Sequence, residues 1–122
     1  MITIHYAMRR KAGMSFEDFS AYWRGSHASL VKALAPKLGI VRYIQHHAVI
    51  ADVAAAMQEA RGTTAPFDGV AAISFASADD LARGNVDPAS ADAQRLLAED
   101  EAKFIDIAES SIFFTTPHEV IV

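Results

Sequence analysis

The alternation and grouping of apolar residues predict four β-strands. Residues 1–8 are short, β-branched and aromatic, which is typical of a strand. Residues 39–50 (GIVRYIQHHAVI) and 70–76 (VAAISFA) predict the second and third strands. Residues 110–122 predict the last strand, in which Pro117 requires a bend or an edge position because proline cannot donate to a ladder.

Helical periodicity follows the first strand. Ser15 and Asp18 form a helix-start signal just ahead of an apolar run. Gly25 and Ser26 interrupt that run, so we expect a kink or a restart with Ser26 as the cap. The apolar positions that recur at helical intervals and define one buried stripe are Phe16, Phe19, Trp23, Leu30 and Leu34.

Further helical segments follow. Pro36 and Gly39 are expected to close the first helix. Residues 52–62 predict a short helix, or an ordered excursion, that ends at its glycine. Residues 77–107 predict a second helical region with a break at 84–88 (GNVDP). The apolar positions of this region are Leu96, Leu97, Phe104 and Ile107.

The order of the elements predicts an α+β ferredoxin-like fold, β-α-β-(α)-β-α-β, as one domain over residues 1–122. Such an antiparallel sheet carries its helices on one face and leaves the other bare, here with Ile, Val, Phe and Tyr exposed. A second copy is the simplest cover for such a face. We therefore expect a homodimer with a barrel-like cavity between two sheets.

Composition narrows the classes of partner. The chain is 52% hydrophobic and 21% charged, and its net charge of −4 argues against nucleic acid. The only basic cluster, residues 9–11, is short enough to cap a strand end. The chain has no cysteine, which excludes thiolate catalysis and fits a cytoplasmic location. No apolar run approaches the roughly 20 residues of a membrane span, so we expect a soluble protein without a membrane partner.

His27 lies four residues after Trp23 and eight after Phe19, and shares the buried stripe if the helix is continuous. One interpretation is a core histidine bonded to a backbone carbonyl. The other is a general acid/base, since a partly desolvated imidazole with a pKa near 6.5 can both take and give a proton.

The second strand has two different faces. Tyr43, Gln45 and His47 lie on one face among valines, whereas His46 lies on the other. Three hydrogen-bonding groups suit a ligand cavity better than a dry contact with helices. The alternative is that the histidine pair is simply exposed near a strand end.

The sequence contains no recognisable motif for a metal site or a cofactor site. Adjacent histidines in a strand point to opposite faces, and no metal-binding spacing stands out. A nucleophile triad, a phosphate-binding loop and a dinucleotide fingerprint are also absent. We therefore expect no metal and no cofactor, and chemistry limited to proton transfers such as isomerisation, dehydration, cyclisation or enolate formation.

Four stretches together resemble EthD-type proteins of the dimeric α+β barrel superfamily. They are RRKAGMSFEDFSAYWRGSHASLV, GIVRYIQHHAV, FDGVAAISF and DEAKFIDIAESSIFFTTPHEVIV. The resemblance implies a dimeric α+β barrel that acts on a small molecule without a cofactor. Characterised relatives include a methylmuconolactone methylisomerase and fungal polyketide dehydratases or decarboxylases.

The resemblance also implies catalytic residues. The family's histidine after its Tyr-Trp pair corresponds to His27, and its strand tyrosine to Tyr43. A second catalytic histidine corresponds to His46 or His47, of which His47 shares the face of Tyr43.

Other positions would shape the substrate pocket. Tyr22 and Trp23 would line it, with Gln45 and His46 as further contacts. In the third strand, relatives often carry Glu and Trp where this chain has Ala72 and Ser74. The resemblance therefore implies a wider pocket that lacks one acid. The list of expected substrate contacts is Tyr22, Trp23, Gln45, His46, Ala72 and Ser74.

Three functions remain open at this point. The first is a cofactor-free isomerase or lyase on a small lactone or polyketide-like ring, with His27 moving the proton, Tyr43 holding an oxygen and His47 assisting. The second is a cofactor-independent monooxygenase of the same superfamily. The third is a small-molecule binder without catalysis.

Overall fold

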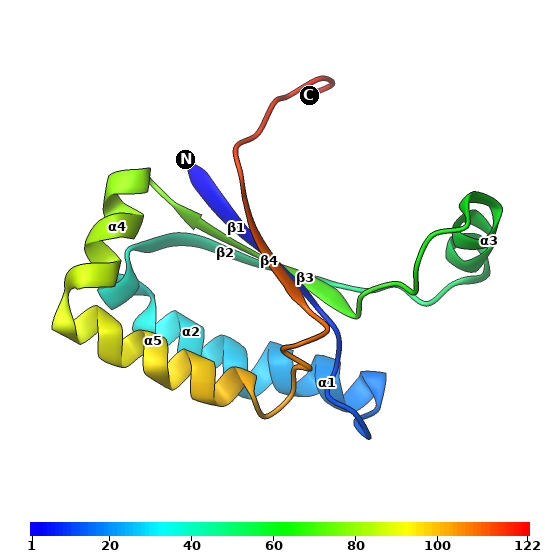
Figure 1. The fold of residues 1–122 in the computed structure, drawn as a ribbon, viewed down its shortest axis with the longest axis horizontal. Coiled ribbons are helices and arrows are strands. Elements are labelled where there is room, and N and C mark those ends of the chain that lie inside the picture. Colours follow the sequence, from blue (N-terminus) through cyan, green and yellow to red (C-terminus); the bar gives the residue numbers. More distant parts are fainter.

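The fold is a four-stranded antiparallel sheet with helices packed on one face (Figure 1). The computed structural model describes residues 1–122 with the exception of the side chain of Asn85. The strand order is β2-β3-β1-β4, and every neighbouring pair is antiparallel. This is the predicted ferredoxin-like arrangement. The strands are β1 (Ile2–Met8), β2 (Ile40–His47), β3 (Gly69–Phe75) and β4 (Ser111–Thr115).

The first helical segment is continuous, so the predicted restart at Ser26 is wrong. It consists of α1 (Phe16–Tyr22), a π-helical turn η1 (Trp23–His27) and α2 (Ala28–Leu38). The expected start is confirmed, because the Ser15 hydroxyl accepts a hydrogen bond from the Asp18 backbone N–H at 3.1 Å. The glycine is accommodated by the wide turn, in which the Ala28 N–H bonds to the Trp23 carbonyl. Single π-helical turns are frequently found at functional sites.

The helix ends follow local signals. Gly39 ends α2 in the left-handed region at φ 74°, where glycine has no steric penalty, whereas Pro36 lies inside the last turn rather than closing it. The excursion after β2 is the helix α3 (Asp52–Arg61), which ends at Gly62 as expected. The expected break in the second helical region is at Asp87, which caps the second of the two helices α4 (Ala78–Val86) and α5 (Pro88–Glu101).

Three predicted segments are shorter in the structure. Helix α5 ends at Glu101, so Phe104 is buried beyond its end and Ile107 is half-exposed. Strand β2 ends at His47 and not at residue 50, and β4 ends at Thr115, before Pro117. The chain leaves the sheet after His47 and after Thr115, so the apolar pattern beyond these two residues does not indicate strand pairing.

The core lies between the sheet and the helices on its one covered face. Phe19, Trp23 and Phe104 are fully buried there, together with Met8 and Tyr6. Phe19 packs against both Trp23 and Phe104, with ring centroids 5.7 and 5.5 Å apart. Trp23 lies directly over Gly69, where a Cβ atom would overlap its ring. This core fixes the position of η1 on the sheet.

The opposite face of the sheet, here called the outer face, carries small and apolar side chains together with the polar side chains of Thr3, His5, Arg42, His46 and Ser74. Phe113 stacks on His5 with ring centroids 5.7 Å apart, and Ile44 and Val70 are partly exposed. The prediction that tyrosine lies on this face is wrong. The register places Tyr6 opposite Ala71 and Tyr43 opposite Ile73, on the covered face. No described helix is long and apolar enough to cross a membrane.

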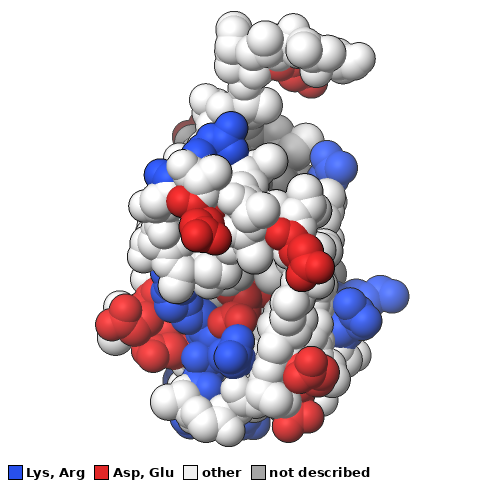
Figure 2. All heavy atoms as spheres, turned by 90° about the vertical axis from the view of Figure 1, so that its right-hand side faces the viewer, with Lys and Arg blue, Asp and Glu red and all other residues white. Residues whose placement is uncertain are grey.

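Helix α3 projects beyond one end of the sheet, and the C-terminal segment projects from another side (Figure 1). Figure 2 shows the face at which α3 lies, with positive and negative side chains interspersed. The C-terminal segment at the top of that view is mostly uncharged. Neither positive nor negative charge therefore dominates the electrostatic potential of this face.

Candidate functional site

A small cavity, here called the His27 cavity, lies between the sheet and the helices. Its volume is about 40 Å³, and Trp23, His27, Tyr43, Tyr6 and Glu101 are among its lining residues. The rest of its wall is aliphatic. His27 is 5% exposed, which confirms the predicted burial of the stripe up to this residue.

His27 is paired with a carboxylate rather than with a backbone carbonyl. Its Nδ1 lies 2.7 Å from Oδ2 of Asp100 on α5, and its ring packs on Phe104 with centroids 4.9 Å apart. The other oxygen of Asp100 accepts a hydrogen bond from the Tyr22 hydroxyl at 2.6 Å, and Lys103 lies 3.5 Å from it. The carboxylate is therefore held on both sides.

The pKa values in this pair favour a neutral imidazole beside an ionised carboxylate. Burial lowers the pKa of His27, and the hydrogen bond and charge of Asp100 oppose this only in part. Burial alone would raise the pKa of Asp100, but the hydrogen bonds from Tyr22 and His27 and the nearby positive charges lower it overall. With Nδ1–H donated to Asp100, Nε2 is the nitrogen able to accept a proton.

The Tyr43 hydroxyl is prepared to donate a hydrogen bond. It accepts from Trp23 Nε1 at 3.1 Å and from Gln45 Nε2 at 3.2 Å, which leaves its own hydrogen for another partner. Burial raises the pKa of this hydroxyl, so it stays protonated at neutral pH. Tyr43 and His27 line the same cavity.

His47 belongs to the network behind the cavity. Its Nε2 lies 2.9 Å from Gln45 Oε1, its Nδ1 lies 2.5 Å from the Ser20 hydroxyl, and its ring lies 4.3 Å from that of Trp23. Gln45 in turn donates to the Trp23 carbonyl in the π-helical turn at 2.9 Å. Burial, and secondarily the Arg24 charge, lowers the pKa of His47.

This network corrects the orientation expected for β2. Tyr43, Gln45 and His47 face α1 and η1, not a cavity between two sheets. The face meets the helices because the three polar side chains satisfy one another and a backbone carbonyl of the turn, which removes the penalty of burying them. The candidate cavity therefore lies within one protomer.

His46, Ala72 and Ser74 lie on the outer face and do not meet His27. The register pairs Ser74 with Thr3 and Ala72 with His5, and the Ser74 and Thr3 hydroxyls are 2.9 Å apart. His46 is opposite Val70 on this same face. Ala72 and Ser74 are the positions at which relatives often carry glutamate and tryptophan. They thus lie on the other side of the sheet from the His27 cavity.

The structure adds three residues that sequence reasoning missed: Asp100, Glu101 and Tyr6. Burial and the charge of Asp100 raise the pKa of Glu101 to about 7. Burial and the charge of Glu101 raise that of Tyr6 to about 12. The two acids follow Leu96 and Leu97 by four residues, and this spacing places them on the apolar face of the helix.

A second cavity, here called the apolar cavity, adjoins the first. Its volume is about 350 Å³, and it shares Tyr6, Ile40, Ile73, Leu97 and Glu101 with the His27 cavity. A bulge between Ile40 and Arg42 interrupts the alternation of β2, so Ile40 lines the helix side. The other apolar walls include Ile4, Leu38, Phe75, Leu81, Ile112 and Phe114.

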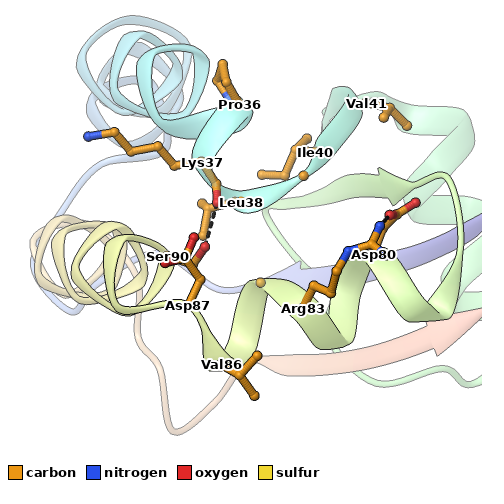
Figure 3. Close-up of a pocket in the computed structure, with 12 residues that line it drawn as sticks. Pro36, Lys37, Leu38, Ile40, Val41, Asp80, Arg83, Val86, Asp87 and Ser90 are labelled. Carbon is orange, nitrogen blue, oxygen red and sulfur yellow. Dashed lines mark hydrogen bonds and ion pairs between the residues drawn. The ribbon is translucent and has the colours of Figure 1, made fainter.

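A wider hollow of about 710 Å³ lies at the far end of α2 (Figure 3). Ser90 donates to the Lys37 carbonyl at 2.6 Å across it, and Asp80 pairs with Arg83 on α4. None of the site residues predicted from the sequence lines this hollow. The titratable groups that could transfer a proton converge instead on the His27 cavity.

In the described part of the chain, no three histidine, cysteine or acidic side chains gather as a metal site would require. The expectation of a site without metal or cofactor stays a prediction.

Comparison with known families identifies one match. The family model of the EthD domain matches residues 11–108, a span that contains His27, Tyr43, Asp100 and Glu101. No curated protein sequence matches the chain.

Solved structures share the fold at low sequence identity. An EthD family protein from Bacillus halodurans superimposes with a TM-score of 0.63 at 11% identity, over 97% of this chain and 100% of that one. A dimeric ferredoxin-like protein of unknown function from Bacteroides fragilis gives 0.57 at 10% identity, over 93% of each chain. A protein proposed to be an antibiotic biosynthesis monooxygenase, from Deinococcus radiodurans, gives 0.53 at 13%, over 100% and 97%.

Proposed function

The chain belongs to the EthD family, and we propose that it is a cofactor-free isomerase or lyase that moves a proton on a small lactone or aromatic polyketide-like ring. The observation that carries this proposal is the hydrogen bond between His27 and Asp100 at the wall of an apolar cavity. A histidine oriented by a carboxylate is a recurring general base.

His27 is the base in this mechanism. Asp100 holds Nδ1–H, so Nε2 takes a proton from a carbon next to a carbonyl group. The imidazolium that forms is stabilised by the adjacent carboxylate, and the low pKa of His27 keeps the base in its reactive form at neutral pH. Tyr22 secures the second oxygen of Asp100 and acts as a positioning residue.

Tyr43 stabilises the enolate. Its two accepted hydrogen bonds leave one O–H to donate to the developing oxyanion in a small cavity with a mostly apolar lining. His47 and Gln45 are positioning residues here, because they fix the Tyr43 hydroxyl and the π-helical turn that carries His27. Trp23 forms the wall between the His47 network and the cavity.

A cofactor-independent monooxygenase is the second candidate. It is favoured by the shared fold with the Deinococcus radiodurans protein. The same base would deprotonate the substrate, and oxygen would then attack the carbanion. The two reactions differ in their need for oxygen, which can be tested directly.

We also propose that the protein is a homodimer joined through its outer face. The apolar side chains of that face and the described dimer from Bacteroides fragilis support this. The cytoplasmic location expected from the composition stays a prediction.

Product analysis tests the proposed function. Wild type, His27→Ala and, as a matched control, His118→Ala are incubated with muconolactones and polycyclic phenols under air and under argon. His118 lies in the exposed C-terminal segment. We expect isomers or water-loss products that form equally under argon, persist in His118→Ala and fall by about 100-fold or more in His27→Ala. Oxygen-dependent products would establish the monooxygenase, and binding without any product would establish a binder.

A further inference from the structure

Glu101 lies at the junction of the two cavities. It is the last residue of α5 and lines both the His27 cavity and the apolar cavity. Its neighbour Asp100 faces His27 and Tyr22, so the two adjacent acids have different surroundings. The junction is the place that any molecule bound in both cavities must pass.

The Glu101 carboxyl has no hydrogen-bond or ion-pair partner among the described side chains. No described side-chain oxygen is both fully buried and unpaired, so the carboxyl oxygens of Glu101 keep some accessible surface, and the residue lines both cavities. A carboxyl group placed among Tyr6, Ile73 and Leu97 without a partner is costly when ionised. Such an arrangement has no structural benefit that a neutral side chain would not also supply.

The volumes restrict how a substrate can bind. The His27 cavity, about 40 Å³, has room for one functional group or a water molecule, whereas the apolar cavity, about 350 Å³, can hold the body of a small ligand. A substrate therefore places its apolar part between α5, β1 and β4 and extends only its reacting end toward His27. That end lies beside Glu101.

We propose that Glu101 is a second catalytic acid/base, which exchanges a proton with the reacting end of an uncharged substrate whose apolar part fills the apolar cavity. This inference rests on the proposed function and adds a residue and a substrate class to it. An anionic reacting group is disfavoured there because it would lie beside the Glu101 carboxyl, whose pKa the Asp100 charge already helps to raise.

The proton steps balance without any further reactant. His27 Nε2 takes the proton of a C–H bond, and the electron pair of that bond forms an enolate whose oxygen accepts from Tyr43. In an isomerisation, protonated Glu101 then gives its proton to another carbon of the conjugated system. In a dehydration, it gives the proton to the departing hydroxyl, which leaves as water with the C–O electron pair. Transfer of a proton from imidazolium to carboxylate restores both groups.

The charged and titratable groups around Glu101 predict a bell-shaped pH profile. They are Tyr6 on β1, Tyr43 on β2, His27 on η1, and Asp100 with its partner Lys103 after it. The rate falls on the acid side as His27 is protonated, at a pKa below its usual value. It falls on the alkaline side as Glu101 ionises near pH 7, because both tyrosine pKa values are raised.

Glu101→Gln tests this role, with Glu99→Gln as the matched control on the same helix. Glu99 is exposed and pairs with Arg95. Turnover is measured from about pH 5 to about pH 9. We expect Glu101→Gln to lower kcat by about 100-fold and to lose the alkaline limb, while Glu99→Gln behaves as wild type. Retention of both the rate and the alkaline limb in Glu101→Gln would overturn the proposal, with the His27 reaction left standing.

A binding measurement separates this proposal from the reaction itself. The carboxyl carbon of Glu101 is followed by isotope-edited NMR, assigned by its loss in Glu101→Gln, and titrated with and without para-hexylphenol. We expect a midpoint near 7 that the probe shifts, together with an unchanged Glu99 signal. A Glu101 signal that the probe leaves unmoved overturns the proposal whether or not turnover is seen. A shifted signal in a protein without proton-transfer turnover overturns the proposed function, and Glu101 is then a ligand contact only.

Discussion

The Nδ1 atom of His27 lies 2.7 Å from Oδ2 of Asp100, although the two residues are 73 positions apart in the chain. The π-helical turn presents the histidine, and the last turn of α5 presents the carboxylate. Phe104, just after α5, packs on the imidazole and holds the two elements together. The contact therefore depends on the tertiary packing of the helices on the sheet.

Asp100→Asn should reduce activity while leaving the fold in place. The amide keeps the shape of the carboxylate, but it no longer fixes the tautomer of His27 or stabilises an imidazolium. We expect kcat to fall by about 100-fold or more with a smaller change in KM, together with a downward shift of the acid limb because the Asp100 charge supports protonation of His27. Steady-state kinetics against pH check this.

The control for that experiment is Asp92→Asn on the exposed side of α5, where the carboxylate pairs with Arg95 at 2.7 Å. Its kinetics should match wild type, since surface pairs contribute little. An unchanged kcat in Asp100→Asn would show that His27 does not depend on its partner.

Glu101→Gln should stabilise the protein at alkaline pH. The pKa of Glu101 is raised in the fold to about 7, above its usual value of 4.5. Its favourable contribution is therefore complete below about pH 4 and is lost as pH rises through 7. Denaturant unfolding should find the variant more stable than wild type by at most about 3 kcal/mol at pH 8, with the difference vanishing in acid. A difference that does not change with pH would contradict the burial of an ionisable carboxyl at this position.

Gly69→Ala should destabilise the fold through Trp23. An added Cβ would overlap the indole ring and come within 2.9 Å of the His46 carbonyl oxygen. Overpacking of this kind costs about 1–3 kcal/mol. Chemical denaturation measures the loss, and a weakened hydrogen bond from Trp23 to Tyr43 should lower activity as well.

Gly25→Ala provides the matched control, because a Cβ there meets nothing within 4 Å. We expect it to be neutral or stabilising by up to about 1 kcal/mol, since alanine has the higher helix propensity. Equal losses in both variants would exclude the close approach of Trp23 as the cause.

Local signals in the sequence were sufficient for most elements. The Ser15 cap, the left-handed glycines at the ends of α2 and α3, and the Asp87 break each act within one or two turns, so they are readable without tertiary information. The π-helical turn could not be predicted from the sequence, because Gly25 permits either a break in the helix or a widened turn. The choice between the two depends on tertiary packing, in which Trp23 lies against Gly69 of the sheet.

The site was predicted in part for a similar reason. Alternation separated Tyr43 and His47 from His46, but a strand alone does not show which of its faces meets the helices. The network from His47 through Gln45 to the turn determines that choice. Asp100 and Glu101 were missed because an acidic run at a helix end normally indicates a solvated face, whereas here the spacing from Leu96 and Leu97 carries both side chains inward.

The proposed dimer predicts the effect of a charge on the outer face. Phe113, on β4, is 49% exposed and stacks on His5. In a dimer joined through this face, Phe113→Asp would bury an unpaired carboxylate in each protomer, so light scattering at micromolar concentration should show a monomer. Ile107→Asp is the control, because Ile107 is equally exposed at 49% but lies outside the strands. It should leave the dimer intact. A dimer that survives Phe113→Asp would place the contact elsewhere, whereas a wild-type monomer would overturn the proposed dimer. Because the residues that line the His27 cavity belong to one protomer, the Phe113→Asp monomer should retain that cavity.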